Sequence, residues 1–167
     1  RNKMNKIEYA PQQLNLIGIV ENLVKIFKDT LEQKDIKVDL LNKLDAVKMN
    51  VFVDSYMLNT VIRNLLSNAI KFSYRGSRID IIFNDFDKNN YSLIFKDYGL
   101  GMSQEQLESL FKIDNKFVRK GTDNEKGTGL GLLLCNDFIE KNNGRILVDS
   151  RIGEGSTFIL VLPKYIE

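Results

Sequence analysis

The chain has 167 residues and a formal net charge of +2, with 43% hydrophobic and 28% charged residues. These values are typical of one globular domain with a single core, and the small net charge gives no signal for a nucleic-acid partner. The single cysteine, Cys135, and the absence of histidine exclude a disulfide framework, a conventional zinc site and a Ser-His-Asp triad. The sequence shows no membrane-length apolar run and no secretory signal. Any chemistry must therefore use carboxylates, amides, lysines, backbone donors or a group from another domain.

The first third of the chain favours a strand, a helix and two further strands. Residues 12–16 favour a short strand, and apolar residues at alternating three- and four-residue spacing predict a helix over 17–31. Alternation with period two predicts a strand over 36–40, and 51–53 form another short strand.

The strongest periodicity in the chain predicts a long helix. It begins after Asp54 or Ser55, either of which can cap it, and ends at the turn residues 74–77. Its apolar residues step by three and one, as in a helix that buries one face. They are Leu58, Val61, Ile62, Leu65, Leu66, Ala69 and Ile70.

Two strands and a long polar stretch follow this helix. Strands are predicted over 78–85 and 91–97, joined by the turn-rich residues 87–90. The polar stretch over 103–126 contains one plausible short helix at 104–111. The length of this stretch is unusual for a compact domain and is typical of a lid, although a solvated loop is the alternative.

The last part of the chain predicts a helix and a hairpin. The helix runs from about 130 to 141, and strands follow at 145–150 and 157–162. One side of this helix is expected to carry Leu130, Leu133, Leu134 and Phe138. The order of elements has no regular βαβ alternation. It predicts an α/β two-layer sandwich of a mixed sheet with helices packed on one face.

Three polar residues of the long helix are candidates for phosphate and metal binding. At 100° per residue, Asn64, Asn68 and Lys71 lie within about 60° of one another, beside the apolar stripe. An amide oxygen can ligate Mg²⁺ without adding negative charge against a triphosphate, and a lysine can offset phosphate charge. The alternative is that these residues form the solvated flank of an amphipathic helix.

A carboxylate ends the strand over 91–97. Alternation places Asp97 on the same face as Leu93 and Phe95, so it lies at the edge of an apolar layer if that face is buried. A buried carboxylate needs hydrogen-bond donors, and the exocyclic amine of adenine is a suitable one, whereas guanine presents a carbonyl there. The alternative is that Asp97 only opens a turn. Gly99 and Gly101 likewise either form that turn or allow close approach of a ligand.

A second glycine cluster, residues 127–131, immediately precedes the helix over 130–141. Free backbone N–H groups at a helix N-terminus attract phosphate. The spacing matches neither the Rossmann fingerprint nor the P-loop, and the alternative is a flexible hinge. Phe111 and Phe117 would anchor the preceding polar stretch if it closes over a ligand.

Together these segments resemble the motifs of bacterial sensor histidine kinases. Residues 64–73 are similar to the N box of that family, and 97–102 to its first glycine box. Residues 111–117 resemble the phenylalanine box, 127–132 the second glycine box, and 153–158 the glycine-containing hairpin that closes the domain. The resemblance implies the Bergerat-type ATP-binding fold, with ATP and Mg²⁺ as cofactors.

The resemblance also implies roles for individual residues. Asn68 would be the Mg²⁺ ligand, and Asn64 and Lys71 would contact phosphates or metal-bound water. Phe72 occupies the aromatic place next to adenine, and Asp97 would read the adenine amine. The contacts expected from the glycine boxes and the lid are Gly99, Gly101, Gly127, Thr128, Gly129, Leu130 and Gly131, with Arg119 or Lys120 reaching the phosphates.

The family's phosphoacceptor histidine lies on a preceding helical dimerisation domain. Residues 1–10 are expected to be the tail of that domain or a linker, and 11–167 the catalytic and ATP-binding domain. The implied reaction transfers the γ-phosphoryl group of MgATP to that histidine, from which an aspartate of a response regulator receiver domain takes it. The resemblance further implies a cytoplasmic domain of a homodimeric parent, and leaves open an anchor in the inner membrane.

Two other functions fit the same residues. One is a different enzyme of this fold, such as a serine-phosphorylating anti-sigma factor kinase or an ATPase that drives conformational work. The other is a non-catalytic nucleotide sensor that binds ATP to dock a partner.

Overall fold

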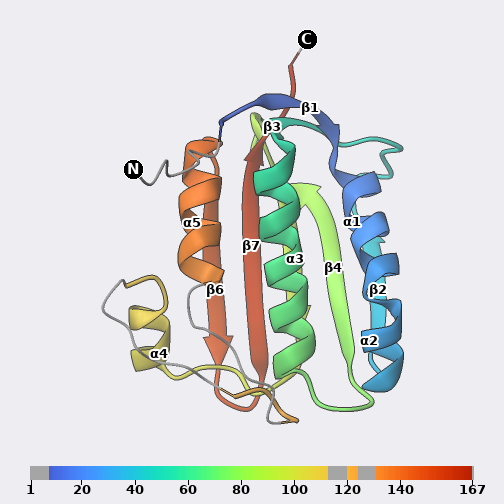
Figure 1. Ribbon diagram of the computed structural model, residues 1–167, viewed down its shortest axis with the longest axis vertical. Coiled ribbons are helices and arrows are strands. Elements are labelled where there is room, and N and C mark those ends of the chain that lie inside the picture. Colours follow the sequence, from blue (N-terminus) through green and yellow to red (C-terminus); the bar gives the residue numbers. More distant parts are fainter. Residues whose placement is uncertain (1–7, 113–119, 124–130, 167) are drawn as a thin grey trace, which may run out of the picture.

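The computed structural model describes residues 8–112, 120–123 and 131–166 and has two layers, with helices packed on one face of a mixed sheet (Figure 1). This arrangement confirms the predicted α/β two-layer sandwich. Among the helices that the structure describes, none has both the length and the apolar character needed to cross a bilayer.

The main sheet has five strands. In spatial order they are β2 (Lys37–Asn42), β4 (Arg78–Asp85), β5 (Asn90–Asp97), β7 (Gly155–Pro163) and β6 (Arg145–Arg151). The pair β2 and β4 is parallel, and the other pairs are antiparallel. This mixture follows from the sequence order, because β4–β5 and β6–β7 are hairpins whereas β2 reaches β4 only through another strand and a helix.

The helices cover one face of this sheet (Figure 1). They are α1 (Leu16–Ile26) and α2 (Lys28–Gln33) over β2, α3 (Ser55–Phe72) over the centre, and α5 (Gly131–Lys141) over β6. The short helix α4 (Gln104–Ser109) lies to one side, near the end of β6. Ser103 begins it with a capping box formed with Gln106.

A small second sheet closes one end of the molecule. Strand β1 (Pro11–Asn15) pairs antiparallel with β3 (Asn50–Asp54), at the top of Figure 1. The sequence predicted both strands but not their pairing, because the two strands are far apart in the chain. Leu16, expected in the first strand, instead begins α1 and is fully buried.

The long helix α3 forms the middle of the core, as its periodicity predicts. The Asp54 carboxylate caps it by accepting a hydrogen bond of 2.9 Å from the Met57 amide. All seven apolar residues of the predicted stripe are at most 4% exposed. Each such burial contributes roughly 1.5–3 kcal/mol for a large aliphatic side chain, so this face fixes α3 against the sheet.

Two details of the predicted helices are wrong. The helix expected over 17–31 is interrupted at Phe27 (φ −85°, ψ 5°), so α1 and α2 are separate. In α5, Phe138 is buried as predicted, together with Cys135 and Ile139, but Leu134 is 43% exposed. The continuous apolar run before Cys135 hides the helical period, which explains the error at Leu134. Burial raises the pKa of the Cys135 thiol to about 12, so it remains protonated at neutral pH.

Candidate functional site

Three backbone segments meet at one end of the main sheet, at the bottom of Figure 1. They are the end of α3 at Phe72, the end of β5 at Asp97, and the turn from β6 at Arg151 into β7 at Gly155. The sequence segments similar to the N box, the first glycine box and the closing hairpin therefore come together in space.

Asp97 is the buried acid of this edge. It is 4% exposed and lies on the helix-facing side of β5 with Leu93 and Phe95, as strand alternation predicts. Its Oδ1 atom accepts hydrogen bonds from the backbone amides of Gly99 (3.0 Å) and Ser156 (3.2 Å). Two amides on one oxygen fix the direction of the carboxylate, because both donors belong to backbone held elsewhere.

Glycines allow these segments to touch backbone to backbone. A Cβ atom at Gly99 would lie 1.7 Å from the carbonyl oxygen of Phe72, and one at Gly155 would lie 2.1 Å from that of Asp97. At Gly101, where φ is +65°, a Cβ would lie 1.8 Å from the last carbonyl oxygen of β6. No side chain fits in these places, so all three positions require glycine.

The polar edge of α3 lies beside the start of α5. Asn64, Asn68, Lys71 and Phe72 are all half-buried. The Asn64 Nδ2 group donates to the backbone of the preceding turn at 2.9 Å. Its Oδ1 atom lies 2.9 Å from the place that a Cβ of Gly131, the first residue of α5, would occupy. The Lys71 ammonium is 5.1 Å from the centre of the Phe72 ring.

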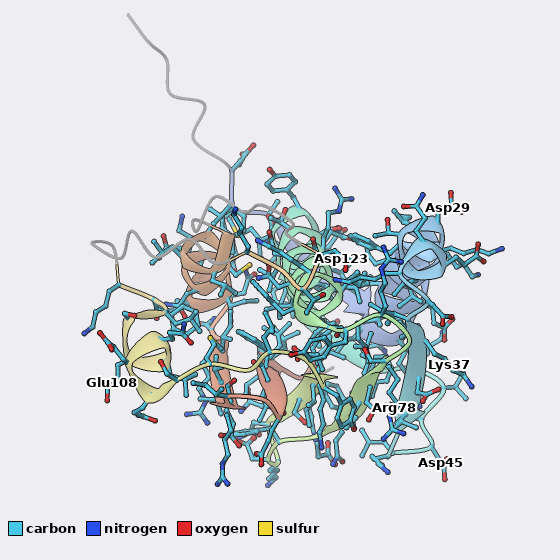
Figure 2. All side chains as sticks on the ribbon, turned by 90° about the horizontal axis from the view of Figure 1, so that it is seen from below. Asp29, Lys37, Asp45, Arg78, Glu108 and Asp123 are labelled. Atoms are coloured by element: carbon cyan, nitrogen blue, oxygen red, sulfur yellow. The ribbon has the colours of Figure 1, made fainter. Side chains whose placement is uncertain are left out.

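Part of the predicted site lies outside the described residues: Arg119, Gly127, Thr128, Gly129 and Leu130. Lys120 is exposed. The segment that begins there is anchored to the end of α3, since the Thr122 amide donates to the Lys71 carbonyl oxygen at 3.1 Å. Asp123, labelled in Figure 2, forms an ion pair of 2.9 Å with Arg75.

Sequence reasoning missed several residues that hold this edge together. The clearest is Lys34, which is 5% exposed and whose ammonium donates to the carbonyl oxygens of Ile70 (2.9 Å) and Lys71 (3.0 Å). A cation at these carbonyls satisfies the C-terminus of α3 and its dipole. Lys34 lies in a polar stretch with no motif, and Ser156 contacts Asp97 through its backbone amide. Thr122 bonds to the end of α3 through both its amide and its hydroxyl. No signal in the sequence marks these residues.

Replacing Lys34 by methionine tests this cap. The Lys34→Met variant keeps the apolar stem but removes the ammonium, so the free energy of unfolding should fall by about 2 kcal/mol. Urea denaturation measures the change. Lys28→Met is the matched control, because Lys28 is 71% exposed and its contact with Glu32 is a surface pair at 3.9 Å. The control should change stability by less than about 0.5 kcal/mol. Equal denaturation midpoints for wild type and Lys34→Met would contradict the capping role.

Residues 53–166 match the family described as histidine kinase-, DNA gyrase B-, and HSP90-like ATPases. The chain belongs to this ATPase family. A curated relative, the histidine protein kinase SaeS of Staphylococcus aureus (strain USA300), is 30% identical over 159 residues, which is 93% of this chain and 44% of SaeS.

Solved structures share the fold of this ATPase domain. The nucleotide-free catalytic domain of histidine kinase ThkA superposes with a TM-score of 0.79 at 22% identity, covering 95% of this chain and 99% of that one. Histidine kinase ThkA in complex with the response regulator TrrA gives a TM-score of 0.77 at 20% identity, covering 96% and 44%. The fold is therefore that of histidine kinase catalytic domains, and membership of the family implies ATP binding. The chain spans less than half the length of the curated relative.

Proposed function

We propose that this domain binds ATP with Mg²⁺ and transfers the γ-phosphoryl group to a histidine on a separate dimerisation domain of its parent protein. The observation that carries the proposal is the Asp97 carboxylate, buried and held by two amides at an edge where backbone segments meet through glycines. A buried carboxylate that is held in one direction can accept a hydrogen bond from a ligand donor placed in that direction.

Asp97 supplies the specificity for adenine in this proposal. Its carboxylate accepts the exocyclic amine of the base, whereas the carbonyl of guanine would face it as a second acceptor. A charge-assisted hydrogen bond of this kind contributes on the order of 1.5–3 kcal/mol. Phe72, half-buried at the end of α3, flanks the base, and Gly99 and Gly101 let the chain turn beside it without side chains.

Polar residues of α3 hold the phosphate end. The Asn68 amide oxygen would hold Mg²⁺, an ion that prefers oxygen ligands. Bound Mg²⁺ would neutralise part of the negative charge of the phosphates. Asn64 and Lys71 contact phosphates or metal-bound water, and Lys120 or Arg119 offers a further cation.

The acceptor histidine of this proposal must lie outside these 167 residues, because the sequence contains no histidine. This domain's share of catalysis is positioning and charge neutralisation, which account for most of phosphoryl transfer. We further propose that the aspartate of a receiver domain takes the phosphoryl group from that histidine. The ThkA complex with a response regulator, which has the same fold in its catalytic part, supports this partner class.

Transfer to a helical domain that bears a histidine tests the proposal. The protein is incubated with that domain, Mg²⁺ and ATP radiolabelled in the γ position. The expected product is an acid-labile, base-stable label on the histidine domain. An acid-stable label on serine would instead indicate a serine kinase of the same fold. ATP binding with no label on any protein would indicate a nucleotide sensor.

Asn68→Asp tests the proposed metal ligand. The substitution adds a negative charge next to the triphosphate and should weaken binding of MgATP about tenfold. Isothermal calorimetry with MgATP measures the effect. Asn59→Asp is the matched control, since Asn59 lies in the first turns of α3 and its amide bonds to Ser55. An unchanged affinity in Asn68→Asp would remove Asn68 from the metal site.

A further inference from the structure

Tyr98 lies directly after Asp97 on the opposite face of the sheet. The ladder with β4 ends at the pair Ile79 and Asp97, and the ladder with β7 ends one residue earlier. Tyr98 is therefore the first residue after β5 and lies beyond both ladders. Because strand alternation turns Asp97 toward the helices, Tyr98 points away from them. Arg78, on the same outer side, is labelled in Figure 2.

A polar network holds the Tyr98 ring on that outer face. Its hydroxyl donates a hydrogen bond of 2.6 Å to Asp80 Oδ2 and accepts one of 3.2 Å from Arg78 Nη2. The Arg78 Nε atom lies 3.5 Å from Asp80 Oδ1, so both oxygens of this carboxylate have partners. The Arg78 guanidinium and the Lys96 ammonium lie 4.9 Å and 5.3 Å from the ring centre.

Asp80 is 7% exposed although it lies on the face without helices. A carboxylate buried to this degree needs donors, and Tyr98 and Arg78 supply them. The hydrogen bond to Tyr98, with the negative charge of Asp80 adding to it, raises the pKa of the Arg78 guanidinium. The charges of Asp80 and Arg78 therefore both have partners, and these contacts favour one position of the Tyr98 hydroxyl.

An open hollow lies beside Tyr98. It has a volume of about 350 Å³ and is lined by Tyr98 together with Lys96, Asp149, Arg151 and Thr157. With a hollow on that side, the hydrogen bonds to Asp80 and Arg78 and the ring contacts of Arg78 and Lys96 hold the ring. They add to the close backbone contact between Gly155 and Tyr98, which also holds the main chain here.

We propose that Tyr98 is a positioning residue for the adenine-binding carboxylate of Asp97, an inference that rests on the proposed function. The Gly99 amide, one of the two donors to Asp97 Oδ1, belongs to the peptide bond that follows Tyr98. Any movement of Tyr98 therefore moves this donor and turns the carboxylate. The Asp80–Tyr98 hydrogen bond fixes, from the outer face, the direction in which the acid points on the inner face.

The test compares ATP with the triphosphate of purine riboside, which lacks the 6-amino group. Tyr98→Phe removes the hydroxyl and keeps the ring, and it should weaken ATP binding about fivefold and reduce the preference for ATP over the analogue by a similar factor. Tyr91→Phe is the matched control, because Tyr91 lies at the other end of β5 and makes a ring contact with Lys164. It should leave both quantities unchanged.

A double-mutant cycle separates positioning from general stability. Asp80→Ala should reduce the preference for ATP as Tyr98→Phe does, and the double variant should be no worse than either single variant. The preference is a ratio of affinities, so it does not depend on the folded fraction. A wild-type preference in Tyr98→Phe would overturn the inference while leaving the proposed function intact. A wild-type protein that does not distinguish ATP from the analogue would overturn the adenine role of Asp97 and this inference with it.

Discussion

Asp97→Asn is expected to weaken ATP binding about a hundredfold, the largest effect of any single substitution in the site. The carboxylate can only accept hydrogen bonds. It accepts from the amides of Gly99 and Ser156 and is proposed to accept from the adenine amine. Asparagine has one acceptor atom and one donor group. With the amide nitrogen toward adenine, the hydrogen bond to the base is lost; with the nitrogen toward Gly99 and Ser156, both backbone hydrogen bonds are lost. In either orientation an N–H group faces another N–H group.

Calorimetric titration with MgATP measures this loss, and circular dichroism shows that the variant is folded. Asp85→Asn is the matched control, because Asp85 ends β4 and pairs with Lys164 at 2.7 Å while half of its side chain is exposed. Its ATP affinity should equal that of the wild type. An Asp97→Asn variant that binds ATP with wild-type affinity would show that the carboxylate does not contact the base.

Gly99→Ala is expected to damage both stability and ATP binding. The added Cβ would lie 1.7 Å from the Phe72 carbonyl oxygen and 2.6 Å from its carbon, which are backbone atoms that no rotamer change can move. The ends of β5 and α3 must therefore separate, which also stretches the 3.1 Å hydrogen bond from Leu100 to Phe72. The free energy of unfolding should fall by about 3 kcal/mol or more.

Gly18→Ala is the matched control, and it should raise the free energy of unfolding, whereas Gly99→Ala should lower it. Gly18 is an exposed residue of α1, and a Cβ there would find its nearest neighbour at 3.5 Å, an ordinary contact. Alanine favours the helix by up to about 1 kcal/mol, so this variant should be slightly stabilised. Urea denaturation of both variants checks the pair. A Gly99→Ala protein as stable as Gly18→Ala would contradict the close packing of the strand end on α3.

The sequence was sufficient for the features that depend on local periodicity. Apolar spacing predicted α3 and its buried stripe, and alternation predicted that Asp97 shares the buried face of Leu93 and Phe95. These predictions succeed because burial of one face imposes a period on the residues themselves. The mixed sheet with helices on one face followed from the order of the elements.

Contacts between distant segments could not be predicted in the same way. The pairing of β1 with β3 and the interruption of the first helix at Phe27 have no local signature. Lys34 resembles any surface lysine in the sequence, and only the fold shows that its ammonium caps α3. Residues 127–130 of the second glycine box and Arg119 lie outside the described residues, so their proposed roles stay predictions from resemblance.

Amide NMR spectra recorded during a titration with MgATP test the central claim most directly. Saturable shifts are expected at Gly99 and Ser156, whose amides bond to Asp97, and along the last turns of α3, with MgGTP at the same concentrations producing much smaller changes. Spectra that stay unchanged up to millimolar MgATP, or that respond equally to MgGTP, would contradict an adenine site built around Asp97.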